Sequence, residues 1–248
     1  MSTLTIRFYE ELNDFLEPEK RKVFYQIRFR YRPSVKHIIE SQHIPHTEVD
    51  LILVNGVSVP FSYKVHDGDR ISVYPVFESI DVSGATRVRA VPLRKPRFIL
   101  DVHLGKLARY LRMCGFDSFY QNSLDDGEIV HHASQERRII LTRDRGLLQQ
   151  REVRKGYWVR SQRPLLQLSV VIYRFVLQSS LSPFKYCMEC NGTITKTSKT
   201  SLRGKIDSDI YLSYNEFHRC RKCGKIYWKG SHYDRMREML DGVVRGTG

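Results

Sequence analysis

No stretch of this 248-residue chain approaches the run of about 18 apolar residues that a membrane-spanning helix needs. The first residues lack the basic and apolar segments of a signal peptide, and no lipidation motif or long amphipathic basic helix is present. We therefore expect a cytoplasmic protein with no membrane partner. Cysteine is scarce, and five is an odd number, so metal binding is favoured over disulfides in that compartment.

After residue 85, basic residues outnumber acidic ones, and this excess makes the whole chain positively charged. Residues 1–85 carry 10 Lys and Arg against 12 Asp and Glu. The remainder carries 31 basic against 15 acidic residues, a net charge of +16. An excess of this size favours a polyanionic partner such as RNA, although solubility alone can also account for it.

Residues 1–80 have the pattern of a small α+β domain. Apolar residues alternate in two N-terminal segments, and Ser34 can cap a short helix. Leu51 to Val54 followed by Asn55-Gly56 is a strong hairpin signal. Two strands, a helix and further strands resemble the β-grasp, or ubiquitin-like, fold. The turns resemble those of sulfur carriers of the molybdopterin-synthase type, but the terminal Gly-Gly of such carriers is absent. We therefore expect a docking or scaffold domain for a protein partner.

Residues 81–97 have the composition of a linker, and we place one domain at 98–182 and another at 183–248 after it. Ser, Gly and Pro break the periodicity of the linker, and five basic residues are interleaved with them. These are Arg87, Arg89, Arg94, Lys95 and Arg97. Solvation explains their charges most simply, with phosphate contact as the alternative.

Two short apolar runs in the middle of the chain each lead to an aspartate. Phe98 to Leu100 precedes Asp101, and Ile139 to Leu141 comes just before Asp144. Helix-like segments separate the runs, which indicates an α/β fold with a parallel sheet and flanking helices. Parallel strands place both aspartates at the carboxyl edge of the sheet, where such sheets bind ligands. Adjacent carboxylates need a proton or a cation between them, so the pattern predicts a magnesium or manganese site.

The segment after Asp101 has helical spacing, and its basic residues differ in their expected roles. Lys106 and Arg109 share one face, and Lys106 lies one turn from Asp101. We favour phosphate contact for Lys106, with an ordinary solvated face as the alternative. We expect Arg112 to lie on a solvated face and Cys114 to be a buried small apolar residue.

Three acids gather at the start of the next helix. Asp125 or Asp126 can cap it, which is the simplest explanation for an aspartate there. The addition of Glu128, in a fold that already offers two aspartates, makes metal ligation about equally favoured.

Two further helix boundaries can be placed. Gly115 suits the C-terminal cap of the helix that follows Asp101. Pro164 suits the first turn of another helix, which we expect to run to about Gln178. Helical spacing predicts that the apolar residues of this helix, up to Val176, are buried.

Several motifs resemble the Mut-seven C-terminal ribonuclease family, a branch of the PIN-domain nucleases. They are Leu-Asp-x-x-Leu-Gly-Lys-Leu-Ala-Arg-x-Leu-Arg-Met-x-Gly from Leu100, Asp-x-Glu from Asp126, and Leu-Thr-Arg-Asp-x-x-Leu-Leu from Leu141. The matching motifs span about residues 98–240 in order. Several bacterial members are similar in carrying an N-terminal ubiquitin-like domain.

The resemblance implies a PIN-like sheet with an acidic edge, a divalent metal and RNA hydrolysis. Carried over by position, it implies Asp101, Asp126 and Asp144 as catalytic metal ligands. A typical PIN site has a fourth acid, which no residue after Asp144 clearly supplies, so Glu128 or Asp125 would substitute. The expected RNA contacts are Lys106, Arg109 and Arg143, and Lys106 would also stabilise charge during catalysis.

The four remaining cysteines form two Cys-x-x-Cys pairs, Cys187 with Cys190 and Cys220 with Cys223, separated by 29 residues. Two such pairs predict a zinc ribbon, in which four thiolates fill the coordination sphere of a structural zinc ion. A redox role is the alternative. Basic residues between the pairs can touch phosphates or be solvated, namely Lys196, Lys199, Arg203 and Lys205. Tyr227, Trp228 and Tyr233 can be core or base-stacking residues, and core is the simpler interpretation.

These patterns favour a magnesium- or manganese-dependent endoribonuclease that leaves a 5′-phosphate and a 3′-hydroxyl. A non-catalytic RNA- or ribosome-binding adaptor that keeps the fold is the first alternative. A metal phosphoesterase for small substrates is the second, and the basic charge argues against it. No base-reading pattern is visible, so the sequence does not predict RNA specificity.

Overall fold

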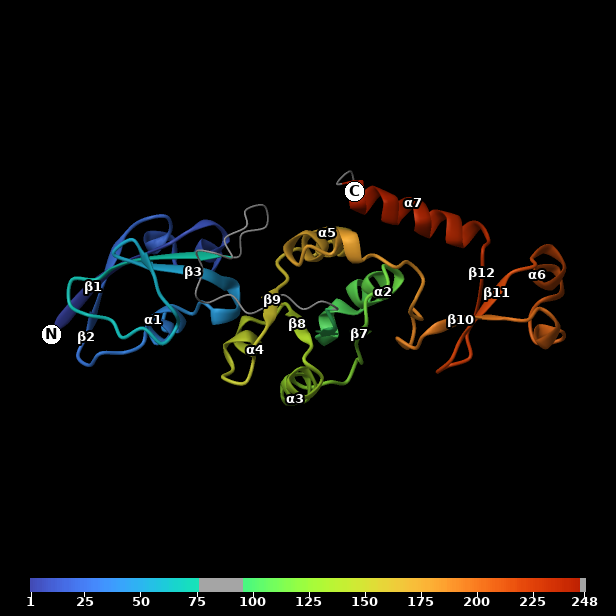
Figure 1. The fold of residues 1–248 in the computed structure, drawn as a ribbon, viewed down its shortest axis with the longest axis horizontal. Helices are drawn as coiled ribbons and strands as arrows, with labels where there is room; N and C mark the ends of the chain where they lie inside the picture. Colours follow the sequence, from blue (N-terminus) through green and yellow to red (C-terminus); the bar gives the residue numbers. More distant parts are fainter. Residues whose placement is uncertain (76–95, 246–248) are drawn as a thin grey trace. The chain divides into compact units, whose positions relative to one another are not determined.

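The computed structural model describes residues 1–75 and 96–245, which group into two compact units (Figure 1). Residues 1–75 and 142–158 form the first unit, and 96–141 and 159–245 form the second. The expected linker, apart from its last two residues, lies outside the described residues. The domain boundaries expected near residues 80, 97 and 182 stay predictions. None of the helices in the described ranges combines the length and hydrophobicity needed to cross a lipid bilayer.

The first unit is built on a mixed sheet with the strand order β2-β1-β5-β3-β4. Its strands are β1 (Ser2–Phe8), β2 (Tyr25–Phe29), β3 (Val49–Val54), β4 (Val57–Ser58) and β5 (Arg70–Pro75). Strand β1 pairs antiparallel with β2 and parallel with β5. Helix α1 (Val35–Glu40) begins after Ser34, whose side chain accepts a hydrogen bond from the His37 N–H. The predicted β-grasp arrangement is confirmed.

Local sequence explains the turns and the core of this sheet. Asn55 and Gly56 have φ angles of 51° and 84°, which suit the tight turn that joins β3 to β4. Alternation buries Leu4, Ile6 and Phe8 on one face of β1. Three short 3-10 turns complete the connections, η1 (Glu10–Phe15), η2 (Pro18–Lys20) and η3 (His46–Glu48).

A segment from the middle of the chain packs with this N-terminal sheet. It contains α4 (Arg145–Gln149) and β9 (Gly156–Trp158). The ring of Trp158 lies 4.9 Å from that of Phe15, and its backbone N–H donates to Glu48 Oε1 at 2.8 Å. Glu48 is fully buried, so this bond satisfies a carboxylate that would otherwise be costly to desolvate. No sequence pattern had indicated this packing.

The second unit is centred on a parallel sheet in which β6 (Phe98–Leu100) lies between β7 (Ser118–Phe119) and β8 (Ile139–Thr142). Leu100 pairs with Leu141, so the two strands end at the same edge. The helices are α2 (Gly105–Met113), α3 (Asp126–Glu136) and α5 (Pro164–Arg174), with the 3-10 turns η4 (Val102–Leu104) and η5 (Gln178–Ser180). Figure 1 shows α2 and α5 on one side of the strands and α3 on the other. The predicted parallel α/β sheet with flanking helices is confirmed.

Helices α2 and α5 are both followed by a residue with a positive φ angle, which is a glycine after α2 and a valine after α5. Helix α2 ends at Met113, and Gly115 lies just past its C-cap as predicted, with a φ of 94°; a Cβ there would collide with the Ser182 carbonyl. Helix α5 ends at Arg174, four residues earlier than predicted. The Leu177 N–H turns back to the Ile172 carbonyl at 2.9 Å, which closes the helix. Val176 consequently has a φ of 51° and is 64% exposed, so the prediction that it is buried was wrong.

The C-terminal part of the second unit is a small antiparallel sheet followed by a helix. The sheet order is β10-β11-β12, from Ile194–Thr197, Phe217–Cys220 and Ile226–Trp228. The turn η6 (Thr200–Leu202) and helix α6 (Ser208–Ser213) lie between β10 and β11 in the chain. Helix α7 (Ser231–Arg245) contacts α5, which places Leu240 and Val243 in buried positions.

Candidate active site and metal centre

Asp101 directly follows the central strand β6 and is only 5% exposed. Its N–H donates to the Leu141 carbonyl at 3.2 Å, which continues the pairing of β6 with β8 by one residue. Its Oδ1 accepts from the His103 N–H at 2.9 Å and caps η4. The predicted ligand is therefore a buried carboxylate at the carboxyl end of a parallel strand, where α/β sheets place their sites.

Tyr120 lies beside this aspartate, and sequence reasoning missed it. Its hydroxyl oxygen is 3.0 Å from the Val102 carbonyl and 2.6 Å from Asn122 Oδ1. Burial, and then the negative charge of Asp101, raise the pKa of Tyr120. Gly105 makes room for the phenol, because a Cβ there would lie 2.7 Å from the hydroxyl oxygen. In the sequence Tyr120 is only the end of a short strand, so nothing marks it.

The acids at the start of α3 divide into capping and non-capping residues. Asp125 is the N-cap, and its Oδ1 accepts from the Glu128 N–H at 2.8 Å. Glu128 reciprocates, since its Oε2 accepts from the Asp125 N–H at 3.0 Å. This capping box engages both candidates for a fourth acid. Asp126 is the first residue of α3, is exposed and is not part of the box.

Asp144 is exposed and belongs to the first unit. Its Oδ1 accepts from the Gly146 N–H at 2.7 Å and so caps α4. Arg143 beside it is exposed, and its carbonyl accepts from the Trp158 indole N–H at 3.2 Å. Asp101 and Asp126 belong to the second unit. That all three hold one ion therefore stays a prediction.

The three basic residues of α2 differ in exposure and in their partners. Lys106 is exposed. Arg109 forms an ion pair with Glu189 at 3.0 Å, which engages the guanidinium that was expected to contact RNA. The prediction that Arg112 is solvated was wrong, since it is 3% exposed. Carbonyl groups around it need buried donors, and its guanidinium donates to Ser118 O at 2.8 Å and to two further carbonyls in the first cysteine pair.

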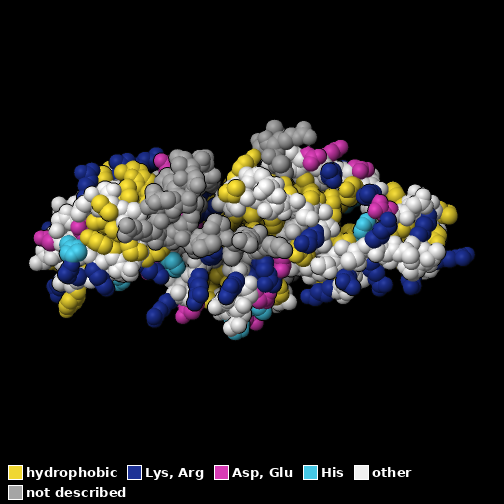
Figure 2. All heavy atoms as spheres, viewed as in Figure 1, with side chains coloured by type: hydrophobic (Ala, Val, Ile, Leu, Met, Phe, Trp, Pro, Cys, Tyr) yellow, Lys and Arg dark blue, Asp and Glu magenta, His cyan; other side chains and the backbone are white. Residues whose placement is uncertain are grey.

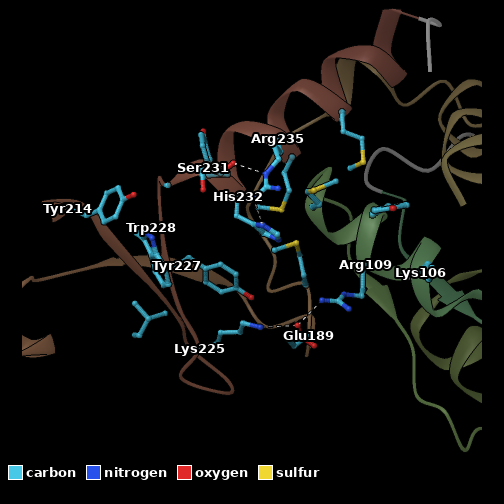
Figure 3. Close-up of a pocket in the computed structure, with 18 residues that line it drawn as sticks. Lys106, Arg109, Glu189, Tyr214, Lys225, Tyr227, Trp228, Ser231, His232 and Arg235 are labelled. Atoms are coloured by element: carbon cyan, nitrogen blue, oxygen red, sulfur yellow. Dashed lines mark hydrogen bonds and ion pairs between the residues drawn. The ribbon is translucent and has the colours of Figure 1, made fainter. Parts of the chain in front are cut away.

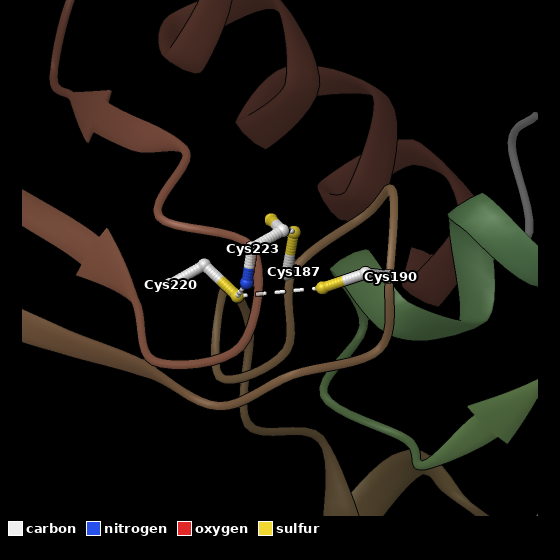
Figure 4. Close-up of side chains that lie close together, drawn as sticks. All are labelled: Cys187, Cys190, Cys220 and Cys223. Carbon is white, nitrogen blue, oxygen red and sulfur yellow. Dashed lines mark hydrogen bonds between the residues drawn. The ribbon is translucent and has the colours of Figure 1, made fainter.

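The four paired cysteines converge, as Figure 4 shows. All four sulfur atoms lie within 4.8 Å of one another, with Cys187 Sγ 3.7 Å from Cys223 Sγ. The Sγ atoms of Cys190 and Cys220 are 3.4 Å apart. A tetrahedral site with Zn–S bonds of about 2.3 Å requires sulfur separations of about 3.8 Å, so the cluster fits zinc. Within the described ranges, no other group of three or more His, Cys, Asp and Glu ligand atoms lies this close.

The backbone around Cys220 favours its thiolate, whereas burial raises the pKa values of Cys190 and Cys223. Backbone N–H groups of Lys222 and Cys223 donate to Cys220 Sγ at 3.4 and 3.5 Å. Burial alone would raise the pKa of Cys220, but these bonds outweigh it and lower the pKa to about 7. Burial also raises the pKa of the fifth cysteine, Cys114, to about 12. Cys114 is fully buried, as predicted, and lies outside the cluster.

A cationic cavity of about 480 Å³ lies beside the second cysteine pair, along β10 and the end of β11. Four of its lining residues are basic and none is acidic, the four being Lys196, Arg219, Arg221 and Lys222. None of the four forms an ion pair with any described residue. Lys and Arg side chains are visible at several places on this part of the chain in Figure 2. Sequence reasoning named Lys196 but missed the others, because they adjoin the second cysteine pair.

Comparison with known families identifies the chain. Residues 96–240 match the family described as Mut7-C RNAse domain, and residues 1–81 match the family described as Mut7-C ubiquitin. The chain therefore belongs to the Mut7-C RNAse domain family and carries an N-terminal ubiquitin-like domain. This confirms the resemblance of the motifs and supports a nuclease-type function in general. No curated protein and no solved structure matched the chain.

Proposed function

We propose that the protein is a metal-dependent endoribonuclease. The observation that carries this proposal is the position of Asp101 within the region that matches the RNAse family. It is a buried carboxylate at the carboxyl end of the central parallel strand. Burying a carboxylate costs desolvation energy, and a bound cation would offset that cost.

The proposed metal ligands are Asp101, Asp126 and Asp144. Their oxygen donors suit magnesium and manganese better than zinc or copper. A bound ion of this kind supplies Lewis-acid polarisation of the phosphodiester and activation of water. Lys106 would hold a phosphate oxygen and stabilise the negative charge that develops during cleavage. Tyr120 would act as a positioning residue, because its phenol lies beside Asp101 and is anchored to Val102 and Asn122.

RNA as the substrate class is supported by charge. The chain after residue 85 carries a net charge of +16, and the described residues that line the cavity beside the second cysteine pair include four cations and no acid. Phosphodiester backbones bind such surfaces with a strong dependence on salt. A small-substrate phosphoesterase has no use for a second cationic surface. Turnover that is insensitive to salt would therefore favour that alternative.

The same cationic cavity also favours a second candidate function, an RNA-binding adaptor that does not cleave. An adaptor needs the cations but not the acids. The two functions separate in a cleavage assay with purified full-length protein, mixed RNA and either magnesium or manganese. We expect cleavage by the native protein and none by the Asp101→Asn variant, while RNA binding by that variant is kept.

The matched control is Asp209→Asn, which makes the same chemical change on the exposed helix α6. It should cleave like the native protein. An adaptor would show equal binding and no cleavage by any of the three proteins, across many RNAs and both metals. That result would overturn the nuclease proposal.

We propose that the N-terminal ubiquitin-like domain binds a protein partner, as docking domains of this fold do. The proposal rests on its family match. A cytoplasmic location remains our expectation from the sequence. Pull-down with residues 1–75 is unsuitable because residues 142–158 complete this unit, so the full chain is needed.

A further inference from the structure

A groove of about 710 Å³ lies within the second unit, between α2, the β10-β11-β12 sheet and the start of α7. Figure 3 shows Tyr214 and Trp228 on one side of it and Lys106 and Arg109 on the other. His232 and Arg235 of α7 border a third side. Methionines add to the apolar lining. None of these features is used by the catalytic proposal except Lys106.

Two aromatic side chains form one wall of the groove. The ring centres of Tyr214 and Trp228 are 6.4 Å apart, with an angle of 44° between the planes. Gly230 keeps the space beside them open, since a Cβ there would be 3.0 Å from both the indole nitrogen and the phenol oxygen. Within the described residues, neither the indole N–H nor the phenol makes a hydrogen bond. Both rings are only half-buried, so each offers apolar surface and a polar atom to a ligand.

The charge lining the groove is unbalanced. Glu189 is the only acid among the described residues that line it, and it pairs with Arg109 at 3.0 Å and with Lys225 at 2.9 Å. Lys106 and Arg235 remain, and neither forms an ion pair with a described residue. An apolar aromatic wall that faces two unbalanced cations suits a ligand with both flat rings and negative charge.

We propose that this groove binds single-stranded RNA, with unpaired bases stacked on Trp228 and Tyr214 and phosphates held by Lys106 and Arg235. The inference rests on the proposed function and describes how the substrate is held. Stacking of this kind requires exposed base faces, which a duplex does not present. An apolar helical peptide would cover the aromatic wall but would leave the two cations without partners.

Lys106 links the groove to the catalytic proposal. It lies on α2, whose start follows Asp101 by the single turn η4, and it also lines the groove. An RNA single strand that contacts Lys106 through one phosphate can therefore place its next unpaired bases along the aromatic wall. The groove would thus favour cleavage in unpaired RNA.

The test uses tryptophan fluorescence, because the chain has only two tryptophans. Trp158 is replaced by Phe, which keeps ring packing on Phe15 and leaves Trp228 as the reporter. Asp101→Asn is added to prevent cleavage of the probe. The probes are a ten-nucleotide oligoadenosine RNA, an abasic phosphodiester of the same length and an RNA duplex. We expect the single strand to quench Trp228 emission, and the abasic strand and the duplex to leave it nearly unchanged.

Affinity of the single strand should fall about tenfold or more in Tyr214→Ala, as expected for the loss of one stacked base. Tyr214→Leu is the second variant if alanine perturbs folding, which circular dichroism would show. The matched control is Tyr31→Ala, which removes an 85% exposed tyrosine from the first unit. It should leave the affinity unchanged.

The proposal is overturned if the single strand binds by fluorescence anisotropy without quenching Trp228, or if the abasic strand quenches equally. Quenching only by an acidic peptide would identify a protein site instead. Cleavage is measured separately in Trp158→Phe with Asp101 intact. Cleavage without quenching would refute RNA binding in the groove and leave the nuclease proposal standing. Quenching without cleavage would refute the nuclease proposal and leave RNA binding in the groove standing.

Discussion

The guanidinium of Arg112 donates a hydrogen bond to the carbonyl of Met188 at 3.0 Å, and so joins helix α2 to the first cysteine pair. The same side chain also donates to the Glu189 carbonyl at 2.9 Å. Asn191 adds a second connection, because its Oδ1 accepts from the Ser118 N–H at 2.9 Å. The first cysteine pair and the parallel sheet are therefore joined by direct hydrogen bonds within the second unit.

Replacing Arg112 should destabilise this unit strongly. Arg112→Met leaves one buried and two partly buried carbonyl groups without their donor and should lower the free energy of unfolding by about 2–4 kcal/mol. Urea unfolding followed by circular dichroism measures the change. Arg109→Met is the matched control, since an exposed ion pair contributes only about 0–1 kcal/mol. Equal losses in the two variants would contradict the structural role assigned to Arg112.

Zinc should contribute to the stability of the sheet as well as to its own site. Metal analysis of purified protein should give one zinc per chain, and Cys190→Ser should lose it. Removal by a chelator should lower the melting temperature, because the connections through Arg112 and Asn191 then lose their anchored partner. Cys114→Ala should keep the zinc, since its thiol is buried away from the cluster. Metal loss in Cys114→Ala alone would refute the assignment.

The two helix ends predict opposite effects of small substitutions. Val176→Gly removes the strain of a valine held at a positive φ angle. It should raise the free energy of unfolding by up to about 1 kcal/mol, once the conformational entropy that glycine loses on folding is subtracted. Gly115→Ala should be destabilising, because its Cβ meets the Ser182 carbonyl. Thermal melts of the two variants and the native protein measure both effects. A lower melting temperature for Val176→Gly would show that the strain is absent.

Stability should fall in acid partly through Asp117. Burial raises its pKa, but hydrogen bonds from Arg138 and Asn191 outweigh burial and hold the pKa below the ordinary 3.8. The ionised form is therefore stabilised by folding. Its contribution is fully present above the unfolded pKa and is lost as the pH falls through the lower folded pKa. The free energy of unfolding, measured in urea from pH 6 to pH 2, should show a shallower acid dependence in Asp117→Asn; an unchanged dependence would contradict this.

Features carried by neighbouring residues were predictable from the sequence. Asn55-Gly56 marks a turn because its required φ angles are local, and the spacing of the two cysteine pairs marks the metal cluster. The short apolar run before Asp101 was enough to place a buried strand and its acidic end. These signals need no knowledge of distant contacts.

Features that depend on distant contacts were not predictable. Arg112 has the helical spacing of a solvated residue, but its guanidinium binds the Ser118 carbonyl and the carbonyls of the first cysteine pair, which lie 76 and 77 residues away in sequence. The packing of Trp158 on Phe15 and the groove beside Trp228 likewise join residues whose local sequence is unremarkable. Val176 continues the apolar spacing of α5, but the backbone turns at that point.

The most direct test of the central claim is manganese binding by the three aspartates, followed as loss of the free Mn²⁺ signal in electron paramagnetic resonance. Asp144 decides the test, because it belongs to a different unit from Asp101 and Asp126. The account predicts that Asn at any one of the three positions weakens manganese binding by about tenfold or more, whereas Asp209→Asn does not. Native affinity in Asp144→Asn would contradict it.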